Sequence, residues 1–84
     1  MDKTSKTLRL ETEKWLSKLE RERSKMQIVS ESKEVKQAVK NLDAYISDSR
    51  HFLGKGDFVR SFEAVVYAWG ILETLERLGL LEKK

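Results

Sequence analysis

Residues 51–72 read HFLGKGDFVRSFEAVVYAWGIL, and this stretch decides how the chain folds. Its GKGD segment, residues 54–57, is the clearest break in a sequence with four glycines and no proline. Gly54 can adopt the left-handed conformation that ends a helix, Gly56 lets the backbone reverse, and Asp57 is a favourable N-cap for the next helix. A connection this short predicts that the two flanking helices are antiparallel neighbours.

The helix that follows this turn, predicted over residues 57–78 with a stop at Gly79, has an unusually wide apolar arc. The arc covers about 240° of the helical wheel, whereas a surface helix usually has a stripe a little wider than about 100°. Two neighbours in a small bundle cover about half of a helix surface, so part of this arc needs another cover. The excess predicts an interaction surface made of Val59, Val66, Tyr67, Gly70 and Ile71.

Gly70 lies inside the predicted helix, where glycine costs about 1 kcal/mol relative to alanine. A second backbone passing close to Gly70 would explain that cost, and a two-fold dimer is a common way to supply one. The alternative is that the chain covers the arc itself. In that case residues 24–32 (SKMQIVSES) and the C-terminal tail would fold over the helix, using the side chains of Ile28, Val29, Leu80 and Leu81.

Two further amphipathic helices precede the turn. The first is predicted over residues 5–26, with Thr4 or Ser5 as N-cap. Its apolar stripe contains Leu8, Thr12, Trp15, Leu16, Leu19 and Met26. The second is predicted over residues 31–53, with Ser30 or Ser32 as N-cap. Its apolar arc spans about 140° and includes Val35, Val39, Leu42, Tyr45, Ile46, Ser49 and Leu53.

These elements predict an all-α protein: a three-helix up-and-down bundle that forms one domain over residues 1–84. The chain is 37% charged and 39% hydrophobic, and its apolar residues are grouped and periodic, which is typical of a folded protein rather than a disordered one. We expect the largest apolar side chains to form the centre of a single core. These are Trp15, Leu19, Leu42, Ile46, Phe58, Phe62, Val65 and Trp69.

The composition also excludes several kinds of chemistry and location. The absence of cysteine excludes disulfides and thiolate zinc sites. No apolar run approaches the roughly 20 residues that span a bilayer, and the N-terminus lacks an apolar signal-peptide core. We therefore expect a cytoplasmic protein that needs no cofactor and does not contact a membrane.

Catalytic groups do not form a recognisable set. His51 is the single histidine, and it lies on the polar face of its helix with Asp48 and Ser47 one turn before it. Residues on one exposed helical face do not assemble a nucleophile, a base and an orienting acid, and a di-metal site would need more carboxylates and a second histidine. We expect a solvated histidine and a protein that is not an enzyme.

Glu73 and Glu76 enter the apolar arc near Trp69 and have two interpretations. Paired carboxylates in an apolar site can perform acid–base chemistry. The simpler interpretation, which we favour, is solvent exposure or ion pairs with Arg21, Arg23 or Lys33, which an up-and-down bundle would bring within reach.

A basic stripe on the first helix offers a second kind of function. Its members are Lys14, Lys18, Arg21 and Lys25, on the face that we expect to lie opposite Trp15 and Leu19. Such a stripe could track the phosphates of a nucleic acid. However, Glu11 and Glu22 flank it, which favours ion pairs within the helix. We also expect no aromatic side chain within it that could stack a base.

The run NLDAYISDSRHFLGKGDFVRSFEAVVYAWGILETLERLGLL, residues 41–81, resembles the archaeal family known as domain of unknown function 357. The resemblance is carried by the KGD turn, by the YA-x-G-x-L-acidic step at residues 67–73 and by the closing LGLL. It implies a three-helix up-and-down bundle in an archaeal cytoplasm, with no established activity and no catalytic residues. The KGD hairpin is also similar to a tetratricopeptide unit, but no second repeat at the 34-residue period supports that fold.

Together these observations predict a non-enzymatic helical module that binds another protein or another copy of itself through the wide arc. The alternative is weak binding of nucleic acid or another anion, without sequence specificity, through the basic stripe. A nucleic-acid partner is the less favoured of the two.

Overall fold

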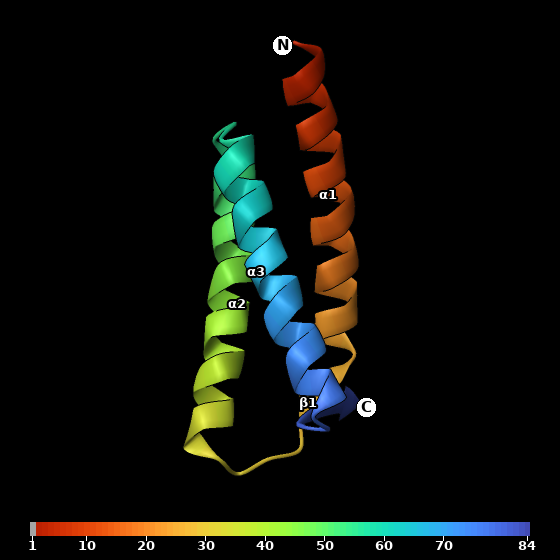
Figure 1. The fold of residues 1–84 in the computed structure, drawn as a ribbon, viewed down its shortest axis with the longest axis vertical. Helices are drawn as coiled ribbons and strands as arrows, with labels where there is room; N and C mark the ends of the chain where they lie inside the picture. The colour runs from red at the N-terminus through yellow and green to blue at the C-terminus, as the bar shows by residue number, and fades with distance from the viewer. Residues whose placement is uncertain (1) are drawn as a thin grey trace.

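Three long helices run down, up and down the length of the molecule, and a short two-stranded sheet closes one end (Figure 1). The computed structural model describes residues 2–84. It is elongated, with principal extents of 46 × 19 × 16 Å. The predicted three-helix up-and-down bundle is confirmed. The elements in chain order are α1 (Lys3–Ser24), β1 (Met26–Ile28), α2 (Lys33–Gly54), α3 (Phe58–Arg77) and β2 (Leu81–Lys83).

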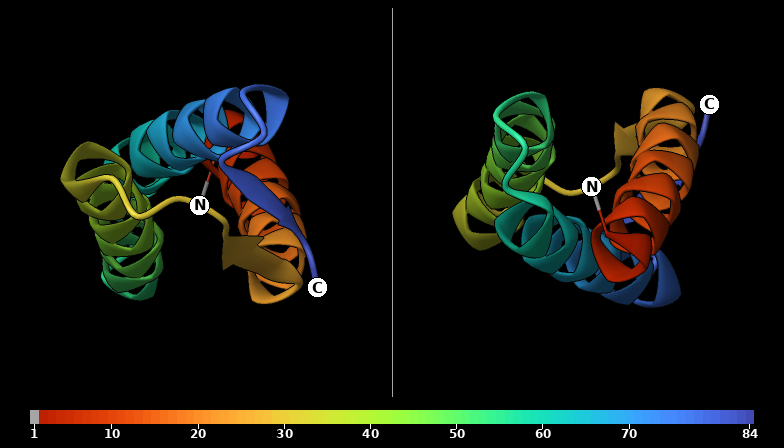
Figure 2. Two further views of the ribbon diagram at one scale, coloured as in Figure 1. Left: turned by 90° about the horizontal axis from the view of Figure 1, so that it is seen from below. Right: turned by 90° about the horizontal axis from the view of Figure 1, so that it is seen from above.

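The helix α3 lies between α1 and α2 (Figure 2). The views along the bundle show α1 and α2 diverging on one side of α3, and the strands β1 and β2 lying on that same side. We call it the inner side of α3. Because its two neighbours and the sheet all lie toward this side, the opposite surface of α3 has no cover from its own chain.

Each helix begins at a polar N-cap that accepts a backbone hydrogen bond. Ser32 and Asp57 cap α2 and α3 through the amides of Val35 and Arg60, as the sequence indicated. The prediction for α1 was wrong, because Asp2 caps that helix by accepting from the Ser5 amide at 2.7 Å. Thr4 and Ser5 already lie inside the helix.

The helices α2 and α3 end in the same way, with a glycine in the left-handed conformation. Gly56 has a φ of 78° and Gly79 a φ of 73°. The Asp57 amide donates to the Phe52 carbonyl at 2.9 Å, and the Leu80 amide donates to the Leu75 carbonyl at 2.9 Å, which is the Schellman pattern. The turn was therefore correctly placed, but Gly56 rather than Gly54 takes the left-handed conformation, because α2 continues to Gly54.

Residues 26–28 and 81–83 pair as an antiparallel ladder that the sequence did not predict. Met26 pairs with Lys83, and Ile28 pairs with Leu81. The first helix therefore ends at Ser24, two residues earlier than expected, yet Met26 is still buried. Since Leu81 is also buried at 1% exposure, each strand contributes one apolar side chain to the core.

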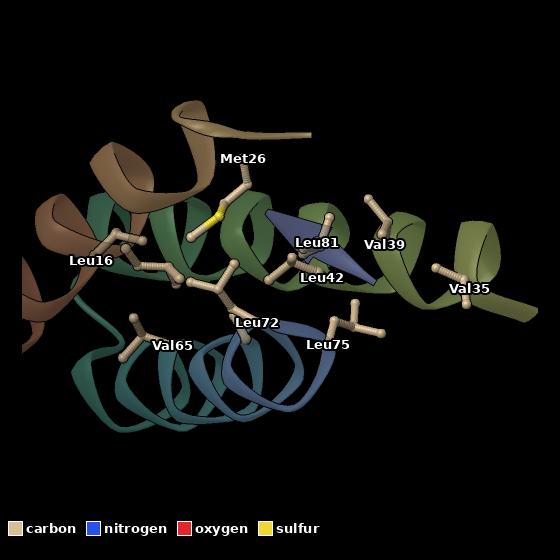
Figure 3. Packing of buried hydrophobic residues seen from close by; sticks show 11 residues of the cluster. Leu16, Met26, Val35, Val39, Leu42, Val65, Leu72, Leu75 and Leu81 are labelled. Carbon is tan, nitrogen blue, oxygen red and sulfur yellow. The ribbon is translucent and has the colours of Figure 1, made fainter. Parts of the chain in front are cut away.

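The core is aliphatic rather than aromatic (Figure 3). The expected central group contained four aromatic side chains, and none of them is fully buried. Trp15 is 37% exposed, and Phe58, Phe62 and Trp69 are half-buried. In the same group Leu19, Leu42 and Val65 are correctly placed, whereas Ile46 packs at the edge. The buried cluster consists of Leu16, Leu19, Met26, Val35, Val39, Leu42, Val65, Ala68, Leu72, Leu75 and Leu81.

A pair of buried serines joins α2 to α3 close to the turn. The Ser49 hydroxyl donates to the Ser61 carbonyl at 2.8 Å, and the Ser61 hydroxyl donates to the Ser49 carbonyl at 2.7 Å. Both side chains are fully buried. Small side chains let the two helices approach closely, and the reciprocal bonds give each buried hydroxyl a partner within the protein.

Candidate interaction surface

The outer face of α3, opposite its inner side, carries large apolar side chains in contact with solvent. We define this face by Val59, Glu63, Val66, Tyr67 and Gly70, all of which are exposed. Val59 is 67% exposed, Val66 52% and Tyr67 57%. These positions follow the helical repeat along one side of α3, so they form a continuous stripe rather than isolated exposed residues.

A shallow groove of about 470 Å³ borders this face on the side of α2. Its lining is mostly apolar and contains Ala38, Val66, Tyr67, Gly70, Ile71, Thr74 and Leu75. The ring of Tyr67 stacks on Tyr45 of α2, with centroids 5.6 Å apart. Four of the five predicted surface residues therefore meet in one groove. Val59 does not line it and lies farther along α3, and Ile71 is half-buried against the core.

Gly70 lies at the edge of the outer face, lines this groove and faces open space. A Cβ added at Gly70 would meet no atom within 4 Å, leaving aside its own helix backbone and its chain neighbours. The expected close backbone approach is therefore not made within the chain. The glycine leaves a gap in the side-chain cover of α3 that only another molecule could use.

The C-terminal tail and the connection after α1 do not cover the outer face. Met26 and Leu81 enter the core from the inner side (Figure 3), and Leu80 packs against that core. Ile28 and Val29 remain 39% and 44% exposed. The alternative in which these segments bury the arc of α3 is thus wrong for its outer face, because the segments lie on the other side of the helix.

A second groove, of about 210 Å³, borders the outer face on the side of α1. It is lined by Trp15, Phe62, Val65, Val66, Trp69 and Glu73. The two indole rings meet edge to face with centroids 6.1 Å apart, and Trp69 Nε1 donates to the Trp15 carbonyl at 3.2 Å. Since Val66 lines both grooves, the outer face of α3 is a ridge with an apolar groove on each side.

The basic stripe of α1 is not separated from the aromatic side chains. The ammonium groups of Lys14 and Lys18 lie 5.9 and 5.2 Å from the centroid of Trp15, and Lys18 lies 5.9 Å from Trp69. The expectation that the stripe lies opposite Trp15 was therefore wrong for these two lysines. Residues one and three positions from Trp15 are 100° and 60° away from it on a helix, which long side chains span easily.

The two glutamates near Trp69 are exposed, and Arg23, one of their expected partners, lies elsewhere. Glu73 lies 4.0 Å from Arg77 of its own helix. Arg23, expected near these glutamates, instead pairs with Asp43 of α2 at 2.7 Å. Glu76 lines a surface hollow with Lys18, Glu22, Trp69, Leu72, Glu73 and Arg77. Their surroundings are those of solvated surface carboxylates.

The remaining chemical groups do not converge. His51 is exposed, with its ring against Phe52 at 5.6 Å between centroids. Between residues 2 and 84 no three histidine, cysteine, aspartate or glutamate side chains are grouped so that they could hold a metal ion. In that same part of the chain no helix is both long and apolar enough to cross a bilayer.

The fold and this surface define a small helical bundle with an exposed apolar ridge. The chain belongs to the family described as protein of unknown function DUF357, whose model matches residues 12–81. The predicted family is thus confirmed, over a longer stretch than the 41 residues that carried the resemblance.

A solved member of this family has the same fold. The crystal structure of protein AF1782 from Archaeoglobus fulgidus is 41% identical to this chain, with a TM-score of 0.84. The match covers 96% of this chain and 99% of that protein. A search of curated proteins finds no match to the sequence. The relatives therefore establish the fold and the family.

Sequence reasoning missed two features of this surface. Tyr45 was assigned to the buried arc of α2, yet it is 37% exposed and stacks on Tyr67. Trp15 was assigned to the core centre, yet it forms a groove wall. The pattern held a signal for Tyr45, which lies near the margin of the apolar arc of α2, but not for Trp15, because Leu16 at the other margin of the α1 stripe is fully buried.

Proposed function

We propose that this chain is a non-enzymatic protein-interaction module of an archaeal cytoplasm, and that it docks a protein on the outer face of α3. The observation that carries the proposal is the exposure of Val59, Val66 and Tyr67 in a chain whose available apolar tail is used on the other side of the helix. Contiguous exposed apolar surface with polar margins is typical of a protein-docking site.

The chemistry of the ridge fits a protein partner. Valine and tyrosine side chains with a polar rim, including Glu63 and Thr74, resemble the composition of protein interfaces. Each flanking groove can take apolar side chains from a partner, and Gly70 lets a partner's backbone come close. The archaeal setting is supported by the Archaeoglobus relative.

A photo-crosslinking amino acid placed at Val66 tests this function directly. In an extract of the native host, we expect position 66 to give protein adducts that a crosslinker at Asn41 does not give. Asn41 is a suitable control because it is exposed on α2 and lines neither groove. Equal yields at the two positions would contradict the docking role of the outer face.

Binding of a polyanion is the second candidate, because Lys14 and Lys18 lie over an exposed indole. Proteins that bind single-stranded nucleic acid combine basic grooves with aromatic stacking platforms. The test is a titration with single-stranded DNA at two salt concentrations, comparing the wild type with the Lys14→Glu/Lys18→Glu variant. Salt-sensitive binding that the variant loses would support this candidate, and no binding at low salt would eliminate it.

A further inference from the structure

The residues along the outer face of α3 are arranged symmetrically about Gly70, and this arrangement indicates which partner the face would bind. The stripe runs through Val59, Glu63, Val66, Gly70, Glu73 and Arg77, at spacings of four and three residues in alternation. This spacing keeps the six residues on one side of the helix. Gly70 lies within this stripe, and a Cβ added there would meet no atom within 4 Å outside its own helix backbone and chain neighbours.

Two charges lie at equal distances on either side of Gly70. Glu63 is seven residues before it, and Arg77 is seven residues after it. Each charge is therefore about 10 Å from Gly70 along the helix axis and on the same side of the helix. Glu63 has no ion-pair partner within the described residues, and Arg77 makes one exposed contact of 4.0 Å with Glu73.

We infer that the outer face of α3 docks the same face of a second copy of this chain, antiparallel, with the two helices crossing at Gly70. In this arrangement a residue a given number of positions before Gly70 meets the residue the same number after it. Glu63 therefore faces the partner's Arg77, and by symmetry the pair forms twice. Val66 faces the partner's Thr74 in the same way.

The charges also select the direction of the partner helix. In a parallel pairing in register, Glu63 would face the partner's Glu63 and Arg77 the partner's Arg77, which repel. A closed two-fold arrangement uses one patch twice and is the commonest symmetry of small oligomers. The antiparallel crossing satisfies both requirements, and glycine at the crossing point allows the two backbones to approach.

The size of the ridge sets the expected strength. A 20-residue helix is about 30 Å long, so a contact along α3 alone is smaller than the roughly 800 Å² per partner of a standard interface. The grooves on either side add apolar area, and the dimer should still depend on concentration across the micromolar to millimolar range.

This inference rests on the proposed docking role of the outer face, and sedimentation equilibrium with charge-reversed variants tests it. The wild type should approach twice the chain mass of 9.8 kDa as concentration rises. Glu63→Arg and Arg77→Glu should each weaken self-association at least tenfold, because each places two like-charged pairs in the interface. An equimolar mixture of the two variants should regain the wild-type association, since every pair is then opposite in charge.

Two further variants control for other effects. Asp48→Arg changes the net charge in the same direction as Glu63→Arg, but on the exposed face of α2, and should associate like the wild type. Gly70→Gln should prevent association while leaving the monomer folded, because glutamine favours helix and the site has open space. If Gly70→Gln still associated, the two helices would not cross at Gly70.

A wild type that stays at 9.8 kDa at all concentrations, or a variant mixture that stays monomeric, would overturn the second-copy proposal. The crosslinking experiment at Val66 separates this failure from failure of the docking role. Adducts with a different protein in the absence of self-association would support the docking role and contradict the dimer. The absence of both adducts and self-association would contradict both proposals.

Discussion

The helix α3 contacts its two neighbours in opposite ways. Toward α2 it presents small side chains, Ser61, Ala64 and Ala68, all buried. Toward α1 it presents Phe62 and Trp69, which are larger and only half-buried. Figure 1 shows that α3 begins beside α2 at the turn and ends near α1 at the sheet, whereas α1 diverges from α3 toward the N-terminus. The edges of the large side chains between α1 and α3 reach solvent.

The difference shows that residue size alone does not determine burial in this bundle. Where small residues bring two backbones together, even hydroxyls are fully buried, as in the Ser49–Ser61 pair. Where indoles separate the helices, a tryptophan is 37% exposed. The α2–α3 interface should therefore carry most of the stability, and the α1–α3 interface should contribute less and remain available for contacts.

The largest expected effect is that of Leu72→Ala. Leu72 is 1% exposed in the aliphatic core, so the truncation should lower the free energy of unfolding by about 2–5 kcal/mol. The matched control is Val66→Ala on the outer face, where surface changes usually stay within about 0.5 kcal/mol. Urea denaturation measures both. Similar losses for the two variants would mean that the inner and outer faces of α3 are assigned incorrectly.

A substitution that enlarges the α2–α3 interface should rank next. Ser61→Leu inserts a branched side chain where the helices are close and removes the bond from the Ser61 hydroxyl to the Ser49 carbonyl, which should cost about 1–3 kcal/mol. Val59→Leu, a similar increase in volume at an exposed position two residues earlier, should leave the denaturation midpoint unchanged. If Ser61→Leu were equally harmless, the interface would be looser than its hydrogen bonds indicate.

The sequence was sufficient for the features set by local chemistry. Helical periodicity, the caps Ser32 and Asp57 and the glycine turn gave three helices with ends correct to within about two residues. It was not sufficient for the strands, because three-residue strands such as Met26–Ile28 have little intrinsic stability and form only when the tail pairs with them.

The exposed residues of α3 could be predicted from the sequence, but the positions of the segments around them could not. The apolar arc on α3 is wider than two neighbouring helices can cover, so the exposure of Val59, Val66 and Tyr67 could be predicted from the width of the arc. The position of Trp15 did not follow, since the wheel gives an angle and not the separation of α1 from α3. The tail's location on the inner side likewise depends on tertiary contacts that no local pattern records.

A hydrogen bond joins α3 to α1, and removing it should have a smaller effect. Trp69→Phe keeps an aromatic ring against Trp15 and removes the hydrogen bond from Nε1 to the Trp15 carbonyl. The expected loss is about 0.5–1.5 kcal/mol in the free energy of unfolding. Tyr67→Phe is the control, because it removes a hydroxyl from an exposed ring. A larger loss for Trp69→Phe than for Ser61→Leu would reverse the order of the two interfaces.

The smallest effect is expected at the first turn of α1, which extends beyond the turn between α2 and α3 (Figure 1). Here the cap, rather than packing, holds the helix. The Ser5 amide donates to the Asp2 carboxylate and lowers the pKa of that carboxyl below its ordinary value. Because the pKa is lowered in the folded state, the charged carboxylate stabilises the turn at pH values above the ordinary pKa of aspartate. This stabilisation is lost as the pH falls through the lowered pKa.

In Asp2→Asn the cap cannot titrate. The Ser5 amide resonance of the wild type should therefore move on acidification below about pH 4, and that of Asp2→Asn should not. Nuclear magnetic resonance at a series of pH values measures this without interference from Glu34, whose pKa is lowered by the Ser32 hydroxyl at the start of α2. An identical titration of Ser5 in both proteins would show that contacts with the rest of the bundle, and not Asp2, order the beginning of α1.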